Sequence, residues 1–243
     1  MALIVLSIGT THPWNVAGVG RDLVVGTDLG ARVFTAVAAV SAQDRSGVTA
    51  LHAVPDETLA AQLATLPWEA AGAVRVGALP TRAAVRVVCD ALRAHPDLAA
   101  VVDPVARASR GGELGEAAAR DALRDELAVL PNVVLTPNLE EAGFLLAQEP
   151  PDRNSLAAAA AALLARGPAA VLLKGGHLEG EPADALATAD GVEILSAPRL
   201  AGAMHGTGCT LAMALACELA SGMPIAKAVR AARAYLRVQL ARH

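Results

Sequence analysis

This chain has few cysteines, no long apolar run and no cluster of basic residues. Its three cysteines, Cys89, Cys209 and Cys217, are an odd number without metal-site spacing, which argues against a disulfide framework and fits a reducing cytosol. No uninterrupted apolar run approaches the ~18 residues needed to cross a bilayer, although 54% of the residues are hydrophobic. The first seven residues lack the basic leader of a signal peptide, so we expect a cytoplasmic protein.

The charge composition is equally restrictive. The formal net charge is −4, with no basic block, which gives no reason to expect a nucleic acid or a membrane as partner. Lysine is scarce, because only Lys174 and Lys227 are lysines among 20 Lys and Arg residues. Because arginine is the usual basic residue of this chain, a lysine at position 174 indicates a need for a compact, flexible ammonium group. Lys227 fits an ordinary surface residue.

Short apolar segments alternate with helical patterns along the whole chain. Strands are expected at 2–7, 33–42, 73–77, 98–103, 133–136 and 169–174, with a hairpin around Ala189-Asp190-Gly191. Helices are expected at 17–29, 56–66, 81–95, 113–129, 139–147, 155–166, 207–221 and 224–242. Strands with little internal polarity, separated by helices, predict an α/β fold, a three-layer α/β/α sandwich around a mostly parallel sheet. No linker or repeat marks a boundary, so residues 1–243 are expected to form a single domain.

Two common nucleotide-binding motifs are absent. There is no G-x-x-x-x-G-K-[ST], which excludes a P-loop kinase, and no complete dinucleotide fingerprint around Gly18, which leaves hydride transfer unsupported. Instead, the run His205-Gly-Thr-Gly-Cys-Thr210 stands directly before an apolar helical stretch. Its glycines let the backbone pass close to a ligand, and the free N–H groups of a helix start bind phosphate.

A cysteine lies inside this run, at position 209. The positive end of a helix dipole favours thiolate over thiol, so Cys209 is a candidate base or nucleophile near neutral pH. The same pattern also fits an ordinary glycine-containing turn with a small residue under a helix start.

Four polar segments follow predicted strands, where the carboxyl ends of a parallel sheet place functional residues. They are Asp103, the segment 136–142, the segment 174–177 that contains His177, and the segment 205–209. Each segment also fits an ordinary turn, but together they supply an acid, an Asn and Glu pair, a lysine beside two glycines and a helix-terminal thiol.

These groups suit phosphoryl transfer, in which positioning and charge neutralisation do most of the work. Asn138 and Glu141 share a helix face, where the carboxylate can hold Mg²⁺ through water; equally, Asn138 can be an N-cap with Glu141 at N3. Lys174 can reach a terminal phosphate or be a solvated loop lysine. Asp103 can support the metal, capture a proton or simply form a turn with Pro104.

The ordered motifs resemble those of the ribokinase-like kinases. The cysteine in the last motif is similar to the hydroxymethylpyrimidine/phosphomethylpyrimidine kinase branch of thiamine biosynthesis, and to relatives among the pyridoxal kinases. The segments 17–19, 22–23, 42–43 and 47–48, with Gly77 and Leu79, extend the resemblance over nearly the whole chain. The motifs are Thr136-Pro-Asn-Leu-Glu-Glu-Ala142, Leu173-Lys-Gly-Gly-His177, Asp184-Ala-Leu186 and His205-Gly-Thr-Gly-Cys-Thr210.

The resemblance implies a role for each matching position, with ATP and Mg²⁺ as cofactors. Cys209 would take the proton of the substrate hydroxyl, and the backbone N–H groups of Gly206, Thr207 and Gly208 would complete the anion hole. The other implied roles are nucleotide and phosphate binding by Lys174, Asn138 and Thr210, metal binding by Glu141 and Asp103, and contact with the pyrimidine ring by Gln43, Gly9 and Gly77. Relatives in this superfamily often dimerise through a sheet edge or lid, so a homodimer is compatible with the resemblance.

Departures from the family pattern concentrate at the substrate end. The family usually begins with a segment like G-[ST]-D-P-S-G-G-A-G, whereas residues 9–18 lack the aspartate and two glycines and are one residue longer. His12 and Trp14 can replace the lost contacts by hydrogen bonding and stacking, or Trp14 can be a buried anchor. The expected function is ATP-dependent phosphorylation of 4-amino-5-hydroxymethyl-2-methylpyrimidine, its monophosphate, or both. A pyridoxal-type vitamin kinase and a non-catalytic pyrimidine-binding protein are the alternatives.

Overall fold

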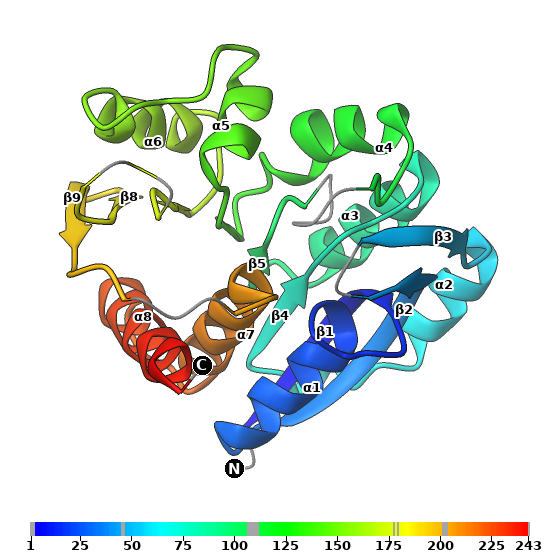
Figure 1. The fold of residues 1–243 in the computed structure, drawn as a ribbon. Coiled ribbons are helices and arrows are strands. Elements are labelled where there is room, and N and C mark those ends of the chain that lie inside the picture. The colour runs from blue at the N-terminus through cyan, green and yellow to red at the C-terminus, as the bar shows by residue number, and fades with distance from the viewer. Residues whose placement is uncertain are drawn as a thin grey trace.

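A computed structural model describes residues 3–44, 47–105, 112–176, 178, 180–200 and 204–242. The strands in these ranges form one nine-stranded sheet in the order β3-β2-β1-β4-β5-β6-β7-β8-β9 (Figure 1). Six strands run parallel, while β3 is antiparallel to β2 and β8 is antiparallel to β7 and β9. The strands are β1 (Ile4–Thr11), β2 (Arg32–Gln43), β3 (Val48–Ala53), β4 (Ala73–Val76), β5 (Ala99–Val102), β6 (Val133–Leu135), β7 (Ala170–Leu173), β8 (Ala183–Thr188) and β9 (Gly191–Ser196).

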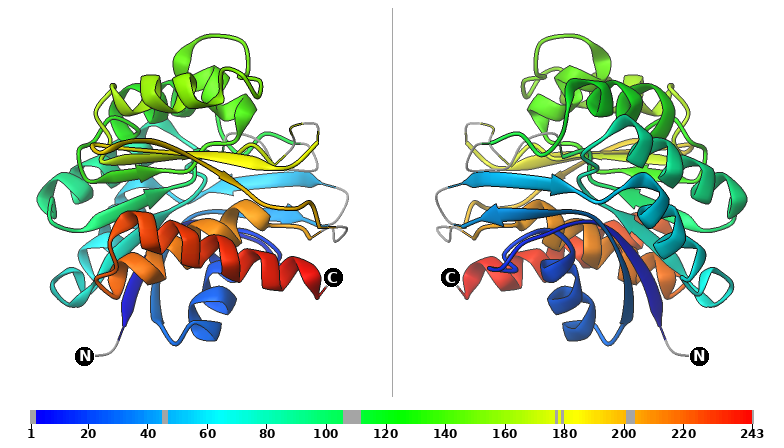
Figure 2. Two further views of the ribbon diagram at one scale, coloured as in Figure 1. Left: turned by 90° about the vertical axis from the view of Figure 1, so that its left-hand side faces the viewer. Right: turned by 90° about the vertical axis from the view of Figure 1, so that its right-hand side faces the viewer.

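Helices cover both faces of the sheet, which gives the three layers that Figure 2 shows edge-on. The α-helices are α1 (Gly18–Asp28), α2 (Asp56–Ala64), α3 (Arg82–Ala94), α4 (Ala117–Ala122), α5 (Leu139–Leu146), α6 (Leu156–Leu164), α7 (Thr207–Ala220) and α8 (Ile225–Ala241). A 3₁₀ turn, η1 (Trp68–Ala70), and a π-helical turn, η2 (Leu123–Leu127), complete the described elements.

Each face of the sheet has its own apolar core. Alternate residues of a strand point to opposite faces, so Leu6 of β1 belongs to the core that includes residues of α2, α3, α5 and α6, whereas its neighbour Val5 belongs to the core that includes residues of α1, α7 and α8. Helix α7 is buried along eight of its residues, from Thr210 to Cys217, because it lies against β1, β4 and β5 and is flanked by α1 and α8. The expected three-layer α/β/α sandwich around a mostly parallel sheet is therefore the observed fold class.

The structure differs most from the predicted elements at β3 and in the helix predicted over 113–129. Strand β3 was not predicted, because its burial pattern is mostly exposed and carries no apolar face; it forms by pairing with the long β2. The predicted helix 113–129 begins only at Ala117 and changes to a π turn at Leu123, a local irregularity that a 3.6-residue pattern does not reveal. The predicted hairpin is confirmed as β8 and β9.

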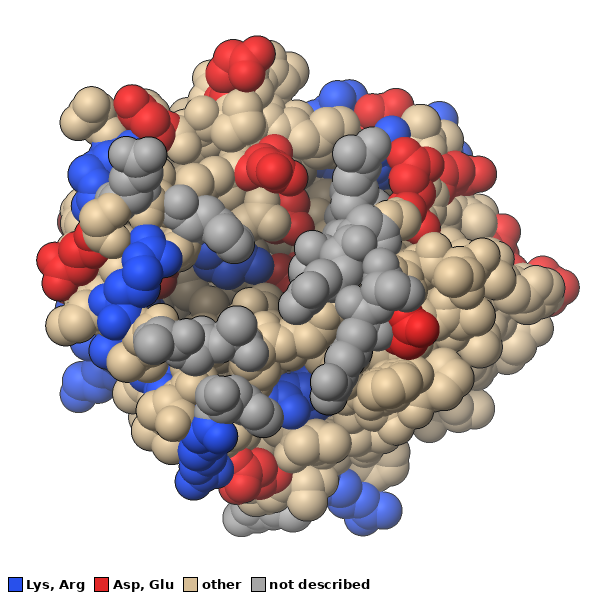
Figure 3. All heavy atoms as spheres, viewed as in Figure 1, with Lys and Arg blue, Asp and Glu red and all other residues tan. Residues whose placement is uncertain are grey.

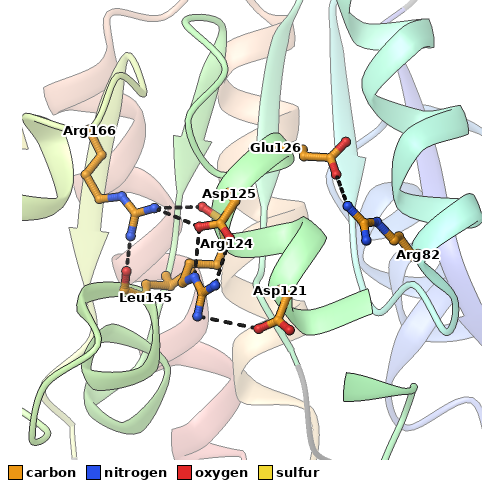
Figure 4. A network of polar contacts seen from close by, with 7 residues as sticks. All are labelled: Arg82, Asp121, Arg124, Asp125, Glu126, Leu145 and Arg166. Atoms are coloured by element: carbon orange, nitrogen blue, oxygen red, sulfur yellow. Dashed lines mark hydrogen bonds and ion pairs between the residues drawn. The ribbon is translucent and has the colours of Figure 1, made fainter. Parts of the chain in front are cut away.

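A network of polar contacts joins the helices on the outer face of the larger core (Figure 4). Arg166, just after α6, donates to the carbonyl of Leu145 in α5 and, at 3.0 Å, to that of Arg124 in η2. Its guanidinium also lies 3.4 Å from Asp125. These bonds join the end of α6 to α5 and η2. In the described part of the chain no helix combines the length and apolar character that a membrane crossing requires.

Candidate active site

The glycine turn before α7 is built for close backbone contact. Gly206 is the N-cap of α7 and has a φ of 77°, in the left-handed region that favours glycine. A Cβ atom at Gly206 would overlap the carbonyl oxygen of Val16, so the turn packs directly on the loop before α1. Thr207, Gly208 and Cys209 form the first turn of α7, and the N–H groups of a first turn have no partner within their helix.

Lys174 and Asp103 meet at this helix start from two different strand ends. The Lys174 Nζ lies 2.7 Å from Asp103 Oδ1. A Cβ atom added to Gly208 would be 3.3 Å from Asp103 Oδ2 and 3.4 Å from Lys174 Nζ, so both side chains lie against the first turn of α7. The structure thus brings together three of the four segments that sequence reasoning singled out.

The fourth segment arrives through the neighbouring strand β6. Lys174 forms an isolated parallel bridge with Asn138, and its N–H donates to the Pro137 carbonyl at 2.8 Å. Asn138 Oδ1 accepts from the Glu141 N–H at 2.9 Å, and Glu141 Oε2 accepts from the Asn138 N–H at 2.8 Å. This is a complete capping box. The capping interpretation of Asn138 is therefore confirmed, and it places the Glu141 carboxylate beside Lys174.

Charge balance in this cluster keeps Lys174 protonated. Burial alone would lower the pKa of Lys174, but the carboxylates of Asp103 and Glu141 outweigh it and raise that pKa. Burial raises the pKa of Glu141 to about 7, against the lowering effect of Lys174. Glu141 can therefore gain or lose a proton near neutral pH, whereas Lys174 stays a cation available to an anionic ligand.

Sequence reasoning missed Arg75, which is fully buried in β4 beneath the site. Its Nε lies 3.4 Å from Asp22 Oδ2, and its Nη2 lies 3.6 Å from Asp103 Oδ2. Asp22 Oδ2 also accepts from the Ser7 hydroxyl at 2.7 Å. Within the described chain, none of the three Arg75 nitrogens completes a hydrogen bond. The only signal in the sequence was a charged residue within an apolar strand, which is typical of a paired buried ion.

Cys209 is influenced by the same guanidinium. Withdrawal from water raises the pKa of Cys209, while the charge of Arg75 and the backbone N–H of Gly18 at the start of α1 lower it. The net direction is upward, so the expectation of a thiolate near neutral pH is wrong for the unliganded chain. The physical reason is that desolvation of Cys209, together with the negative charges of Asp103 and Asp22, exceeds the lowering effect of Arg75 and the Gly18 N–H.

The predicted substrate residues lie at the carboxyl ends of β1, β2 and β4. Gly9 and Gly77 flank the guanidinium of Arg75, and a Cβ atom at Gly77 would overlap Arg75 Nη1. Gln43 ends β2 and is buried. The two glycines therefore leave space for the Arg75 side chain. This packing role is separate from their predicted contact with the substrate ring. Trp14, in the loop before α1, is 53% exposed, which excludes the buried-anchor interpretation.

Several neighbouring residues have structural partners of their own. The buried Thr210 hydroxyl accepts from Arg21 Nε at 2.9 Å, so this side chain joins α7 to α1, although Thr210 was predicted to bind phosphate. Asp184 accepts from the Gly175 N–H at 2.9 Å and lies 2.8 Å from Arg233, which fixes the loop after Lys174. The motif residue His177 lies outside the described residues.

The face that carries this site is hollowed. Figure 3 shows a hollow with basic side chains gathered beside it, on the side of β8, β9 and α8. No group of three or more His, Cys, Asp or Glu side chains converges as a metal site in the ranges that the structure describes. Mg²⁺ usually takes one or two carboxylates and completes its shell with phosphate and water, so a larger cluster is not required for the predicted Mg²⁺ site at Glu141 and Asp103.

The sandwich and its helix-terminal glycine turn define a ribokinase-like kinase. Residues 13–243 match the family model described as phosphomethylpyrimidine kinase. The chain is 38% identical over 235 residues to hydroxymethylpyrimidine/phosphomethylpyrimidine kinase of Streptomyces coelicolor, covering 96% of this chain and 87% of that protein. This chain therefore belongs to the phosphomethylpyrimidine kinase family.

Solved structures agree with this assignment. Phosphomethylpyrimidine kinase from Clostridium difficile has a TM-score of 0.84 at 25% identity and covers 98% of this chain and 99% of its own. Pyridoxal kinase from Staphylococcus aureus, in complex with pyridoxal, has a TM-score of 0.88 at 25% identity and covers 99% of this chain and 88% of its own. The fold is thus shared with a phosphomethylpyrimidine kinase and with a pyridoxal kinase.

Proposed function

We propose that residues 1–243 form one ribokinase-like kinase domain that transfers the γ-phosphoryl group of ATP to 4-amino-5-hydroxymethyl-2-methylpyrimidine or to its monophosphate, giving the diphosphate. The observation that carries the proposal is the contact of Lys174 with Asp103 at 2.7 Å against the first turn of α7, where a Cβ atom added to Gly208 would lie 3.4 Å from Lys174 Nζ. Membership of the phosphomethylpyrimidine kinase family supports the choice of acceptor. We place the protein in the cytoplasm, where ATP is available. Its three cysteines are free thiols, which fits the reducing conditions of that compartment.

Each group has a place in the transfer. Lys174 neutralises the phosphates, and the N–H groups of residues 207–209 hold the transferring phosphoryl group. A bound Mg²⁺ would neutralise phosphate charge; Glu141 is the better candidate to hold it, because Asp103 is already paired with Lys174 and Arg75. Cys209 accepts the proton when the acceptor is the free alcohol, while the alcohol oxygen attacks phosphorus and ADP departs.

The monophosphate acceptor makes a different demand on Cys209. A phosphate monoester has its second pKa near about 6, so its attacking oxygen is already ionised at neutral pH. Because burial raises the pKa of Cys209, less of this residue is present as the thiolate, the form that can accept a proton. We therefore expect the phosphate step to depend less on Cys209 than the alcohol step.

The test is ATP consumption by the wild type and by Cys209→Ala with three acceptors: the pyrimidine alcohol, its monophosphate and pyridoxal. We expect the wild type to act on one or both pyrimidines, and Cys209→Ala to lower kcat with the alcohol by about 10²-fold or more. Unchanged alcohol turnover would refute the proposed base. Turnover of pyridoxal alone would replace the pyrimidine assignment, and no turnover with any acceptor would favour a non-catalytic binding protein. Sedimentation of the same preparation tests the homodimer that the family resemblance allows.

A further inference from the structure

Lys174 extends toward the first turn of α7 from a backbone that is held on both sides of its Cα atom. The Lys174 N–H donates to the Pro137 carbonyl at 2.8 Å, just after β6. The next N–H, that of Gly175, donates to Asp184 Oδ1 at 2.9 Å. Because peptide units are planar, these two bonds fix the peptide planes before and after the Lys174 Cα atom. Pro137 and Asp184 therefore set the direction in which the Lys174 side chain leaves the backbone.

Asp184 lies in β8, the strand that pairs antiparallel with β7. A Cβ atom at Gly175 would overlap the Ala183 carbonyl oxygen, so the loop after Lys174 passes β8 at a distance that only glycine allows. A hydrogen bond to a carboxylate is also stronger than one between neutral groups. The close approach and the charged acceptor together hold the backbone after Lys174 on β8.

The second oxygen of Asp184 is held by Arg233 of α8. Arg233 Nε lies 2.8 Å from Asp184 Oδ2, and its Nη2 donates to the Leu195 carbonyl in β9 at 2.5 Å. The two side chains are only 16% and 15% exposed, so water screens this ion pair less than a pair on the open surface. Both carboxylate oxygens of Asp184 thus have donors from the protein, and the carboxylate is fixed relative to α8 and β9.

The side chain held in this way ends at the expected phosphate site. Lys174 Nζ lies 2.7 Å from Asp103 Oδ1, and it would be 3.4 Å from a Cβ atom added to Gly208. A misplacement of about 1 Å at a reacting group can lower a rate by about 10²-fold. The bonds from Arg233 to Asp184 and from Asp184 to Gly175 therefore connect α8 with the placement of the ammonium group.

We propose that Asp184 and Arg233 are positioning residues for the nucleotide phosphates, and that they act on Lys174 through the backbone of Gly175. The proposal rests on the proposed function for the role of Lys174. It gives a task to the motif Asp184-Ala-Leu186, which no step of the phosphoryl transfer uses. The competing explanation is a purely structural link between β8 and α8.

Nucleotide binding tests the proposal without turnover. The probe is a non-hydrolysable ATP analogue with Mg²⁺, titrated calorimetrically into each variant. Asp184→Ala loses the bonds to Gly175 and Arg233, and we expect its Kd to rise about tenfold. Asp184→Asn keeps an oxygen for the Gly175 N–H but loses the charge, so a smaller rise of about threefold is expected.

Coupling to Lys174 distinguishes positioning from a structural link. If Asp184 acts through the ammonium group, removing that group first removes the effect, because residues that act together are non-additive. In the Lys174→Met background we expect Asp184→Ala to change the Kd by less than about twofold. An equal rise in both backgrounds would overturn the proposal. If Asp184→Ala does not fold, the same comparison is made with Asp184→Asn.

Arg230 provides a matched control on the same helix. It lies one turn before Arg233, and its hydrogen bonds within the described ranges go to Glu193 of β9 and to the Ala226 carbonyl. Arg230→Met should keep the wild-type Kd, whereas Arg233→Met should raise it and Arg233→Lys should restore part of the affinity. An equal rise in Arg230→Met would show a general loosening of α8 and would overturn the proposal.

Turnover separates this proposal from the proposed function. Asp184→Ala is expected to lower kcat/KM for ATP about tenfold, with the KM for the pyrimidine acceptor within about twofold of the wild type. Pyrimidine turnover by the wild type, with an unchanged Kd in Asp184→Ala, would overturn the positioning role and leave the kinase assignment standing. Coupled nucleotide binding without turnover of any acceptor would support the positioning role and refute the kinase. A wild type that does not bind the analogue would refute both.

Discussion

Replacing Arg75 with methionine removes the cation that Asp22 and Asp103 share beneath the site. Methionine keeps an unbranched apolar stem in the buried space, so the main change is the loss of charge. Asp103 remains paired with Lys174 at 2.7 Å. Asp22 keeps the Ser7 hydroxyl at 2.7 Å and the weaker influence of Arg21, but it loses the cation that acts on it most strongly. The stability of Arg75→Met should therefore depend on the protonation of Asp22.

The size of this effect follows from the pKa of Asp22, which burial raises from 3.8 to about 6 while Arg75 opposes the rise. Because the folded pKa exceeds the unfolded one, the wild type loses about 3 kcal/mol as pH rises from about 4 to about 6. Without Arg75 the pKa rises further, and each pH unit above about 6 costs the variant a further ~1.4 kcal/mol until its new pKa is reached. The added loss from Asp22 is thus near zero at about pH 5, about 1.4 kcal/mol near pH 7 and at most roughly 2.7 kcal/mol near pH 8.

Urea unfolding followed by circular dichroism at about pH 5, 7 and 8 measures this difference between the wild type and Arg75→Met. Lost packing adds an offset that does not vary with pH, so the slope against pH is the informative quantity. Arg75→Lys keeps a cation and should show a smaller slope, and Asp22→Asn combined with Arg75→Met should show none. A difference that stays constant from about pH 5 to 8 would refute the coupling of Arg75 and Asp22.

Two further predictions concern charge at the site and contacts far from it. Lys174→Met should lower kcat by about 10²-fold or more in an ATP-consumption assay, because the cation beside the anion turn is lost. Lys174→Arg should retain only part of the wild-type rate. An unaffected kcat in Lys174→Met would show that Lys174 takes no part in the transfer. Arg166→Ala, which loses its bonds to the Leu145 and Arg124 carbonyls, should lower the free energy of unfolding by about 1–3 kcal/mol with kcat and KM unchanged. A changed kcat in that variant would show that the outer helix contacts reach the active site.

The fold followed closely from local patterns because parallel strands buried on both faces read as plain apolar runs. Strand β1 is an example: its apolar start marked it, although it extends to Thr11 rather than Ser7. Strand β3 gave no such signal, because its exposed residues, such as Thr49, pair with β2 without an apolar face. An edge strand of this kind forms through backbone hydrogen bonds to its neighbour, and this pairing leaves no hydrophobic pattern in the sequence.

The site could be predicted only in part for the same reason. Asn138, Glu141, Lys174 and Cys209 lie in motifs whose spacing is local, so they could be found in the sequence. Arg75 had no motif to mark it, since its partners are 53 positions earlier at Asp22 and 28 later at Asp103.

The sequence by itself determined the alternation of strands and helices, the capping box at Asn138 and the glycine turn before α7, because each depends on neighbours within a few residues. Only the tertiary structure decided which charges meet. It placed Lys174 on Asp103, and it buried Cys209 enough that burial outweighs the charge of Arg75 and raises the pKa of the thiol. Pairing and desolvation depend on the distance between side chains in space and on the water excluded around them, and neither quantity is a property of sequence spacing.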